Sequence, residues 1–440
     1  MNHISVVIPY STDNYFPATL QQFIDSPLVS SIFVLNDGSF VSKIKKCEPV
    51  KLPDISSGKS LNAILGKITT EYFLFISQAQ MLTLNQAALE RFLHVARDTG
   101  AGMVYSDFYE VKQGSRSEHP VIDYQFGSVR DNFDFGGMLF YSTKAVRKAL
   151  KKYGKIDSVK FAALYDLRLK VSTDFELFHL QEFLYTKTES DTRRSGEKQF
   201  DYVDPKNQNV QKENELVFTK HLKRIGAFLK PKFAKVKNQN EFYPVEASVV
   251  IPVKNRERTV GDAVNSILAQ KTDFPFNILV VDNYSTDNTP NILRFLAAKD
   301  SRVKHIIPNR QDLGIGGCWN EAVLSEHCGR YAVQLDSDDL YSGPETLQKI
   351  VNVFRKEQCA MVIGSYTLVN MNLEPIPPGL IDHKEWTPDN GRNNALRING
   401  LGAPRAFNTG VLRNILLPNT SYGEDYAVAL RLSREYQIGR

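Results

Sequence analysis

Four consecutive polar residues in the second half of the chain are suited to binding a metal ion and phosphate. Asp336, Ser337, Asp338 and Asp339 follow an apolar, strand-like run. In a parallel α/β sheet, ligands bind beyond the carboxyl ends of the strands. Carboxylates two positions apart at such a place can share a hard divalent cation with phosphate oxygens. The alternative is structural, because Ser337, Asp338 or Asp339 could instead cap a helix expected near 344–356.

A similar strand opening occurs twice along the chain. Residues 4–9 read Ile-Ser-Val-Val-Ile-Pro, and residues 248–252 read Ser-Val-Val-Ile-Pro. Each is followed by an apolar run that ends in an acid, Asp37 in the first copy and Asp282 in the second. A period of about 240 residues is far longer than that of a solenoid repeat, so each copy is expected to be a whole domain.

The two copies agree in spacing but differ at the acid cluster. Ala79 and Asp166 are 87 positions apart, and Asp338 and Asp425 are also 87 positions apart. The stretch aligned with the cluster, residues 77–80, reads Ser-Gln-Ala-Gln and contains no carboxylate. We therefore expect the second copy to carry the chemistry, while the first keeps Asp166 at the place of Asp425.

Strand-like and helix-like segments alternate, which is typical of an α/β protein with a mostly parallel sheet. In the second copy, an apolar strand at 248–251 precedes helical spacing over 260–270. A second buried strand at 278–281 and a helix start at 287–290 follow. The sequence therefore predicts two tandem domains. The expected limits are 1–230 for the first domain, 231–245 for a linker and 246–440 for the second domain.

A helix is expected over 211–229, ended by Pro231 because proline cannot continue a helix. The basic residues of this helix and its exit would suit either a peripheral contact with anionic lipid or a solvated surface. These residues are Lys220, Lys223, Arg224, Lys230, Lys232, Lys235 and Lys237.

Bulk composition excludes several classes of protein. A chain of 440 residues with 42% apolar and 23% charged residues suits a soluble protein of two domains. The net charge of +5 does not favour a nucleic-acid partner. The four cysteines lack metal-site spacing and are expected to be free thiols in a reducing compartment. Because neither a transmembrane stretch nor a signal peptide is recognisable, we expect the protein in the cytoplasm.

Five motifs occur in order along the second copy. They read Val-Val-Ile-Pro-Val-Lys-Asn-Arg at 249–256, Val-Asp-Asn-Tyr-Ser-Thr-Asp at 281–287, Asn-Arg-Gln-Asp-Leu-Gly-Ile-Gly-Gly-Cys-Trp-Asn at 309–320, Asp-Ser-Asp-Asp at 336–339 and Gly-Glu-Asp at 423–425. Together they resemble the family-2 glycosyltransferases with the GT-A fold. The resemblance covers about residues 246–440, and a weaker one covers 3–230. It implies two tandem GT-A-like domains with Rossmann-like, mostly parallel sheets, the first of them degenerate.

The resemblance implies a donor site for a nucleoside-diphosphate sugar, with a UDP-sugar as the expected donor. Asp338, with Asp336, would hold Mn or Mg, which neutralises the departing diphosphate. Asp282 would recognise the base or the ribose, although the family's common Asp-Asp pair reads Asp282-Asn283 here. The glycines of the third motif, at 309–320, would let the backbone approach the nucleotide closely. The further donor residues implied are Pro252, Asn255, Arg256, Asn283, Gly314, Gly317, Asn320 and Ser337.

The resemblance places the catalytic base at Asp425, beside Glu424. An inverting transfer needs a carboxylate that accepts the proton of the acceptor hydroxyl as this hydroxyl attacks C1. A structural role is the alternative, because both acids open an expected helix. The acceptor would be a saccharide or a lipid-linked saccharide, with a site around 380–408. The candidates there are His383, Arg405 and Trp386, of which Trp386 could equally be a core residue.

The expected activity is transfer of a hexosyl or N-acetylhexosaminyl group in bacterial polysaccharide or glycan synthesis, at the inner face of the plasma membrane. A bifunctional polymerase with two transferase sites and a non-catalytic nucleotide-sugar-binding scaffold are the alternatives. The first copy continues for about 60 residues beyond Asp166, a typical length for closing an α/β sheet. The second stops soon after Asp425, so a C-terminal truncation is expected. No spacing encodes the sugar, the linkage or the oligomeric state.

Overall fold

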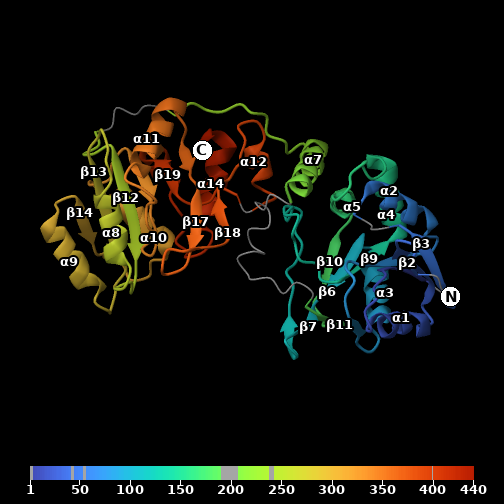
Figure 1. The fold of residues 1–440 in the computed structure, drawn as a ribbon. Coiled ribbons are helices and arrows are strands. Elements are labelled where there is room, and N and C mark those ends of the chain that lie inside the picture. Colours follow the sequence, from blue (N-terminus) through green and yellow to red (C-terminus); the bar gives the residue numbers. More distant parts are fainter. Residues whose placement is uncertain (1–2, 41–43, 53–55, 190–206, 237–241, 399) are drawn as a thin grey trace. The chain divides into compact units, whose positions relative to one another are not determined.

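A computed structural model describes residues 3–40, 44–52, 56–189, 207–236, 242–398 and 400–440. The chain forms two compact units, Met1–Phe228 (unit 1) and Leu229–Arg440 (unit 2), coloured along the sequence in Figure 1. Within the described ranges, no helix is both long and apolar enough to cross a bilayer.

Unit 1 alternates strands and helices, as its sequence predicts. Its elements are β1 (Ile4–Pro9), α1 (Phe16–Asp25), β2 (Val29–Asn36), β3 (Cys47–Lys51), α2 (Gly58–Lys67), β4 (Tyr72–Ile76), β5 (Leu82–Leu84), α3 (Ala88–Thr99), β6 (Met103–Ser106), β7 (Phe108–Lys112), β8 (Ser115–His119), β9 (Met138–Ser142), α4 (Thr143–Tyr153), α5 (Ala163–Val171), β10 (Leu177–Leu180), β11 (Tyr185–Thr188) and α7 (Gln208–Arg224).

Unit 2 follows the same rhythm. Its elements are β12 (Ala247–Val253), α8 (Val260–Leu268), β13 (Phe276–Asp282), α9 (Thr289–Lys299), β14 (Val303–Ile306), α10 (Ile315–Leu324), β15 (Tyr331–Gln334), α11 (Thr346–Glu357), β16 (Met361–Ile363), β17 (Tyr366–Val369), β18 (Pro375–Ile381), α12 (Gly391–Asn394), β19 (Arg405–Asn408), α13 (Thr409–Arg413), α14 (Glu424–Glu435) and β20 (Ile438–Gly439).

The main sheets of the two units share one strand order and one set of strand directions. The order is β10-β6-β9-β4-β1-β2-β3 in unit 1 and, read in the same sense, β20-β16-β19-β15-β12-β13-β14 in unit 2. In each sheet the third strand of this order, β9 or β19, is antiparallel to its neighbours, and the other pairs are parallel. The fold is therefore mixed α/β with mostly parallel sheets.

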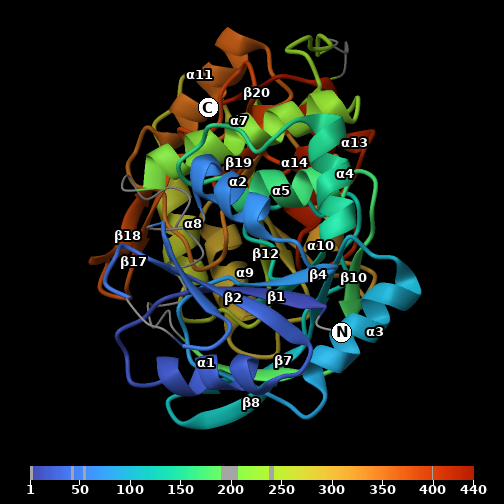
Figure 2. The same cartoon turned by 90° about the vertical axis from the view of Figure 1, so that its right-hand side faces the viewer.

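Helices cover both faces of each sheet. In unit 1, α1 and α3 lie on one face, and α2, α4, α5 and α7 lie on the other, as Figures 1 and 2 both show. In unit 2, Val249 and Ile251 of β12 pack into one core with residues of α8 and α11. Val250 packs into a second core with residues of α10 and α14. Because side chains alternate along a strand, one apolar strand supplies both cores.

One tertiary contact occurs in the same form in both units. In α2, the Asn62 side chain donates to the carbonyl oxygen of Ile156 and accepts from its N–H (2.9 and 3.1 Å). In α10, Asn320 makes the same two bonds with the backbone of Leu417 (2.8 and 2.9 Å). A Cβ on Gly58, near the start of α2, would overlap the carbonyl oxygen of Asp157. The asparagine contacts join α2 to the segment that precedes α5 in unit 1, and α10 to the segment that precedes α14 in unit 2.

The Asn62 and Asn320 contacts change one alignment made from sequence spacing. Seven positions separate Ile156 from the first residue of α5, and seven separate Leu417 from the first residue of α14. Counted from these helix starts, Leu164 takes the place of Asp425, and Asp166 lies two positions further along. The prediction that Asp166 keeps the catalytic position was therefore wrong. Asp166 instead forms a buried ion pair with Lys170 at 2.6 Å.

Strand register changes a second alignment in the same way. Pro9 pairs with Leu35 in unit 1, and Pro252 pairs with Val281 in unit 2. Asn36, rather than Asp37, therefore corresponds to Asp282. Register also places Ile4 opposite Tyr72 and Ala247 opposite Tyr331. Counting along β4 and β15 from these pairs aligns Ser77 with Asp336 and Ala79 with Asp338, as predicted.

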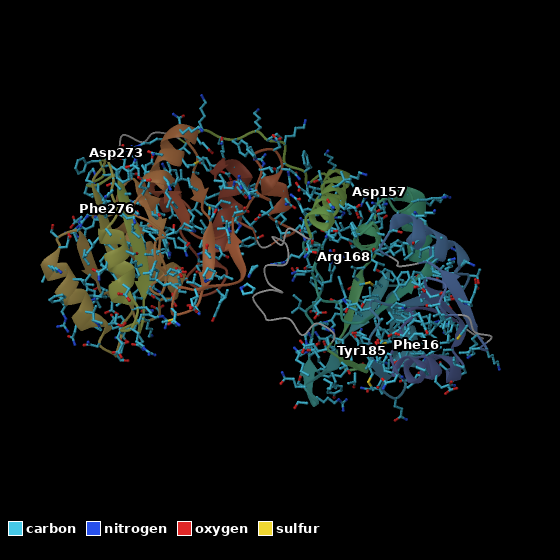
Figure 3. The ribbon with its side chains drawn as sticks, in the orientation of Figure 1. Phe16, Asp157, Arg168, Tyr185, Asp273 and Phe276 are labelled. Atoms are coloured by element: carbon cyan, nitrogen blue, oxygen red, sulfur yellow. The ribbon has the colours of Figure 1, made fainter. Side chains whose placement is uncertain are left out.

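Aromatic rings pack at the end of β1 in unit 1. Tyr10 follows β1 at the position that Val253 occupies in β12. Its ring lies 5.1 Å from the rings of both Phe16, labelled in Figure 3, and Phe40. Large aromatic side chains thus pack beside the end of β1 in unit 1, whereas the loop after β12 in unit 2 carries Lys254, Asn255 and Arg256.

The helix and linker expected between the domains differ in their limits from the prediction. Helix α7 ends at Arg224, before Pro231, and Gly226 has a left-handed φ of 74°, a common helix-ending conformation. Part of the predicted linker bonds to unit 2, where the N–H of Ala234 donates to the carbonyl oxygen of Glu435 (2.8 Å). Residues 237–241 lie outside the described residues.

The basic residues around α7 are partly engaged within unit 1. Lys220 pairs with Asp157 at 2.6 Å, and Arg224 lies 3.9 Å from Asp166. These two ion pairs favour a structural role for the helix over a lipid contact at these positions. Lys237 lies outside the described residues.

Substituting Gly58 by alanine should destabilise unit 1 by about 1–3 kcal/mol, because the added Cβ would overlap backbone that cannot move freely. Gly66→Ala in the same helix is the matched control, since its Cβ would have no neighbour within 4 Å. The free energy of unfolding should be measured by circular dichroism in urea. Both tryptophans, Trp319 and Trp386, lie in unit 2, so their fluorescence serves as an internal reference. Equal stability of the two alanine variants would contradict the expectation.

Candidate active site

A cavity of about 370 Å³ in unit 2 brings together the acids of two sequence motifs. It opens at the carboxyl ends of β12 and β15 and at the start of the antiparallel strand β19. Of the residues predicted from sequence, it is lined by Pro252, Arg256, Asn283, Asp336, Ser337, Asp338, Arg405, Glu424 and Asp425. Cavities of this size hold small molecules and cofactors.

The acid cluster forms one wall of this cavity. Asp336 comes two residues after the end of β15, and Ser337 is buried while Asp336 and Asp338 remain accessible to solvent. Helix α11 begins later, at Thr346, and its N-cap residue, Glu345, makes no side-chain capping bond. The acids therefore do not cap this helix, and the structural alternative for them is excluded.

The carboxylates of this wall repel one another. Surrounding protein atoms raise the pKa of Asp336, and the charges of Asp338 and Asp425 add to the effect, while Gln334 and Arg405 oppose it. Burial, together with the charges of Asp336 and Asp338, raises the pKa of Asp339 to about 6. Asp338 faces a cation, with its Oδ2 3.8 Å from Nε of Arg256. A divalent cation at this wall would relieve the same repulsion.

The donor atoms fit Mg or Mn bound together with a diphosphate. Asp336 and Asp338 offer only oxygen, the ligand type that these ions prefer. Within the described ranges, no three His, Cys, Asp or Glu side chains form a ready-made metal cage. Mg commonly takes one or two carboxylates and completes its shell with substrate phosphates and water. The acid wall matches that arrangement.

The first turn of α14 forms the opposite wall. Gly423 precedes this helix with a left-handed φ of 77°, so Glu424 and Asp425 are its first two residues. Oδ2 of Asp425 accepts an ion-paired hydrogen bond from Nη1 of Arg405 at 2.6 Å. Glu424 is buried, and its Oε2 has no hydrogen-bond partner. Burial and the charge of Asp425 raise the pKa of Glu424.

Asp282, the last residue of β13, and Asn283, which follows it, differ in how well they fit the donor role predicted for both. Asn283 lines the cavity, and its Nδ2 donates to the carbonyl oxygen of Leu313 (2.8 Å), which leaves its buried Oδ1 without a partner. Asp282 is only 2% exposed and accepts from the N–H of Ser285 (2.9 Å). Its other oxygen lies 3.2 Å from Nε2 of His305. The structure therefore points Asn283, rather than Asp282, toward a ligand.

Other predicted donor residues shape the site from outside the cavity lining. Asn255 joins two loops, because its Oδ1 accepts from the N–H of Thr286 at 2.7 Å. A Cβ on Gly314 would meet the backbone of Thr420, and one on Gly317 would meet the Asn419 side chain. With Asn320, these glycines hold the segment that precedes α14. The absence of a side chain at these glycines allows this close packing. Packing therefore accounts for both glycines without the predicted approach of their backbone to the nucleotide.

Two of the three acceptor candidates are buried in the core. The Trp386 side chain is 8% exposed and donates through its indole N–H to the carbonyl oxygen of Ile438 (3.2 Å). His383 is fully buried, and its Nδ1 lies 3.0 Å from Oε1 of Glu385. Neither lines the cavity, so the core alternative holds for Trp386. Arg405 does line the cavity.

Sequence reasoning missed part of the cavity lining. Beyond the residues assigned from sequence, the lining includes Val253, Lys254, Ile315, Cys318, Trp319, Gln334, Phe407, Leu417 and Ser421. Gln334 could have been found from the sequence, because it is a polar residue within an apolar, strand-like run. Trp319 packs edge-on against Phe407 with 5.7 Å between ring centroids, a contact that no local pattern reveals.

Residues 248–416 match the family model described as glycosyl transferase family 2. This match supports a family-2 glycosyltransferase in unit 2. It spans the strand ends and the acid wall, and it stops before α14.

The curated relatives include bacterial proteins named as glycosyltransferases. The chain is 32% identical over 28% of its length to the UDP-Glc:alpha-D-GlcNAc-diphosphoundecaprenol beta-1,3-glucosyltransferase WfgD of Escherichia coli, covering 47% of that protein. It is 28% identical over 34% of its length to the putative teichuronic acid biosynthesis glycosyltransferase TuaG of Bacillus subtilis, covering 58% of it. The chain thus spans about half the length of these relatives.

Among solved structures, S. aureus TarS 1-349 in complex with UDP-GlcNAc is 22% identical. The alignment covers 44% of this chain and 59% of that chain, with a TM-score of 0.35.

Proposed function

We propose that unit 2 is a metal-dependent, inverting glycosyltransferase that moves a sugar from a nucleoside-diphosphate sugar to a saccharide or a lipid-linked saccharide. The observation that carries the proposal is a single cavity with the Asp336–Asp338 wall on one side and the Glu424–Asp425 turn on the other. Donor activation and proton acceptance need such groups around one small volume.

On the donor side, Asp336 and Asp338 would hold Mn or Mg, whose positive charge stabilises the departing diphosphate. Lys254 and Arg256 line the same cavity and add cationic groups for phosphate oxygens. The buried Oδ1 of Asn283 has no partner in the protein and is available to accept a hydrogen bond from the donor. Uracil and guanine offer a ring N–H on the pairing edge, and cytosine and adenine offer an exocyclic amine, so this acceptor suits a nucleobase without selecting one. A UDP-sugar is the donor that we propose, as the sequence predicts.

On the acceptor side, Asp425 would accept the proton of the attacking hydroxyl. The new bond joins the acceptor oxygen to C1 of the sugar while the bond from C1 to the diphosphate oxygen breaks, with inversion at C1. The proton moves to Asp425, and the electron pair leaves with the nucleoside diphosphate. Arg405 keeps Asp425 oriented through the 2.6 Å ion pair.

Unit 1 is proposed to be a degenerate copy of unit 2 that positions the acceptor or a partner. The shared strand order and the paired Asn62 and Asn320 contacts support duplication. Ser77, Ala79 and Leu164 stand where unit 2 has its three acids. Unit 1 therefore lacks the carboxylates for a metal-dependent transfer, and the bifunctional alternative would require a second site in unit 1 that works without a metal.

The biological setting is proposed from the names of the relatives. WfgD of E. coli is named for a diphosphoundecaprenol-linked acceptor, and TuaG is named for teichuronic acid biosynthesis. We place this protein in the synthesis of a bacterial polysaccharide at the inner face of the plasma membrane.

A donor screen with Mn tests the function. UDP-, GDP-, CDP- and ADP-sugars are added to the protein, and unfolding of unit 2 is followed by tryptophan fluorescence. A true donor at 100 times its Kd should stabilise the folded unit by about 2.7 kcal/mol. The same donor should release free nucleotide steadily when acceptor saccharides are supplied. Binding without turnover would favour the scaffold alternative, and no stabilisation by any donor would reject the proposal.

A further inference from the structure

A polar pair spans two neighbouring strands beneath the acid wall. Gln334 ends β15 and Arg405 begins β19, and the antiparallel register places them opposite each other. Nε2 of Gln334 donates to Oδ1 of Asp336 at 3.0 Å. Its Oε1 accepts from Nη1 of Arg405 at 3.2 Å. One amide therefore bonds both to a donor-side acid and to a cation.

The cation extends this connection to the other wall of the cavity. Nη1 of Arg405 also donates to Oδ2 of Asp425 at 2.6 Å, and its Nε donates to the carbonyl oxygen of Leu401 at 2.7 Å. The Arg405 side chain is 14% exposed, so its orientation depends on these partners. A continuous series of hydrogen bonds thus runs from Asp336 through Gln334 and Arg405 to Asp425.

Unit 1 offers an internal comparison. Phe75 pairs with Leu139 across β4 and β9, at the positions that Gln334 and Arg405 hold in unit 2. Both of these residues are apolar, and unit 1 has Leu164 at the place of Asp425. The shared strand frame is thus stable with an apolar pair. The polar pair accompanies the acids and is not a requirement of the sheet.

We propose that Gln334 is a positioning residue that holds the donor-side Asp336 and, through Arg405, the proton-accepting Asp425 in one fixed arrangement. This inference rests on the proposed glycosyl transfer. The side-chain amide donates to a carboxylate through its nitrogen and accepts from a guanidinium through its oxygen at the same time. Methionine makes neither bond, and glutamate accepts from Arg405 but cannot donate to Asp336. Loss of such supporting bonds commonly lowers activity or metal affinity by about 10- to 100-fold.

The test compares Gln334→Met and Gln334→Glu with the unaltered protein in kcat, in donor KM and in Mn binding followed by electron paramagnetic resonance. For Gln334→Met we expect kcat to fall by about 10- to 100-fold while donor KM changes by less than about threefold, because orientation rather than binding is lost. For Gln334→Glu we expect kcat to fall by a similar factor, because the link to Asp336 is broken, while Mn binding persists because the added carboxylate supplies further negative charge. Gln348→Met is the matched control, because Gln348 is half-buried on α11 outside the cavity lining and also loses a hydrogen bond, the one from the N–H of Asp273. This variant should behave like the unaltered protein.

A double variant tests the connection through Arg405. If Gln334 acts through Arg405, adding Gln334→Met to Arg405→Met should lower kcat by much less than it does alone. Full additivity of the two losses, or a kcat of Gln334→Met within about twofold of the unaltered protein, would overturn the inference. Those results would not contradict the proposed function, because the unaltered protein would still transfer the sugar. An inactive unaltered protein would overturn the function and the inference together. Should Gln334→Met fail to fold, the polar Gln334→Glu variant decides through kcat, and a value within about twofold of the unaltered protein would overturn the inference.

Discussion

Replacing Asp425 by asparagine is expected to lower kcat by about 10²- to 10⁴-fold, the usual contribution of a general base. The amide keeps nearly the same size, and its oxygen can still accept from Arg405. It cannot accept a proton from the acceptor hydroxyl, so the chemical step loses its base while the cavity keeps its shape. Initial rates of nucleotide release, measured with saturating donor and acceptor, check this expectation.

Donor binding separates loss of the base from loss of the fold. In the Asp425→Asn variant, stabilisation of unit 2 by the donor and Mn should equal that of the unaltered protein, because Asp425 lies on the acceptor wall. Asp389→Asn is the matched control, since Asp389 is exposed and outside the cavity lining. A kcat of the Asp425 variant within about tenfold of the control would show that the acid at this helix start has only a structural role.

Replacing Asp338 by asparagine is expected to remove metal-dependent donor binding and to lower kcat/KM by about 10³-fold or more. A metal ion contributes several kcal/mol to stabilising the departing charge, and each 1.36 kcal/mol corresponds to about tenfold in rate. The neutral amide is a weaker ligand for a hard cation. Calorimetric titration of Mn and nucleotide, together with initial rates, measures both effects.

This variant should behave differently from the Asp425 variant. Asp338→Asn should lose the stabilisation by donor and Mn, whereas Asp425→Asn should keep it. Asp312→Asn is the control, because Asp312 is an exposed acid that pairs with Arg310 at 2.6 Å. Unchanged Mn affinity in Asp338→Asn, or full activity of the unaltered protein in excess chelator, would contradict metal dependence. A second transfer activity that survives Asp338→Asn would revive the bifunctional alternative.

Local periodicity predicted most of the elements that carry the site. The β-branched run at 248–251 became part of β12, and α9 begins at Thr289, within the predicted start at 287–290, although its N-cap residue Asn288 makes no side-chain capping bond. Asp336 and Asp338 lie after a buried strand, because a strand that is buried on both faces ends where the sequence turns to charged residues. The sequence predicted the end of a helix less accurately where a left-handed backbone conformation, rather than a proline, ends the helix. Helix α7 ends near Gly226 rather than at Pro231.

Spacing along the chain failed where a helix start or a strand register decides which residues correspond. The 87-residue interval made Asp166 the counterpart of Asp425. The packing of Asn62 and Asn320 shows that the helix starts place Leu164 there instead. Loop lengths can compensate for one another, so equal intervals in sequence do not ensure equal positions in space.

The sequence by itself determined the α/β class and the acids from which a site could be built, and it predicted the internal repeat. Those features depend on the local alternation of apolar and polar residues and on the few residue types that bind metals. Only the tertiary structure decided that Gln334 and Arg405 meet across two strands and connect Asp336 with Asp425. It also decided that Trp386 belongs to the core and that Asn283 faces the cavity. Such contacts depend on cross-strand register and on packing between residues far apart in the chain, which no local pattern encodes.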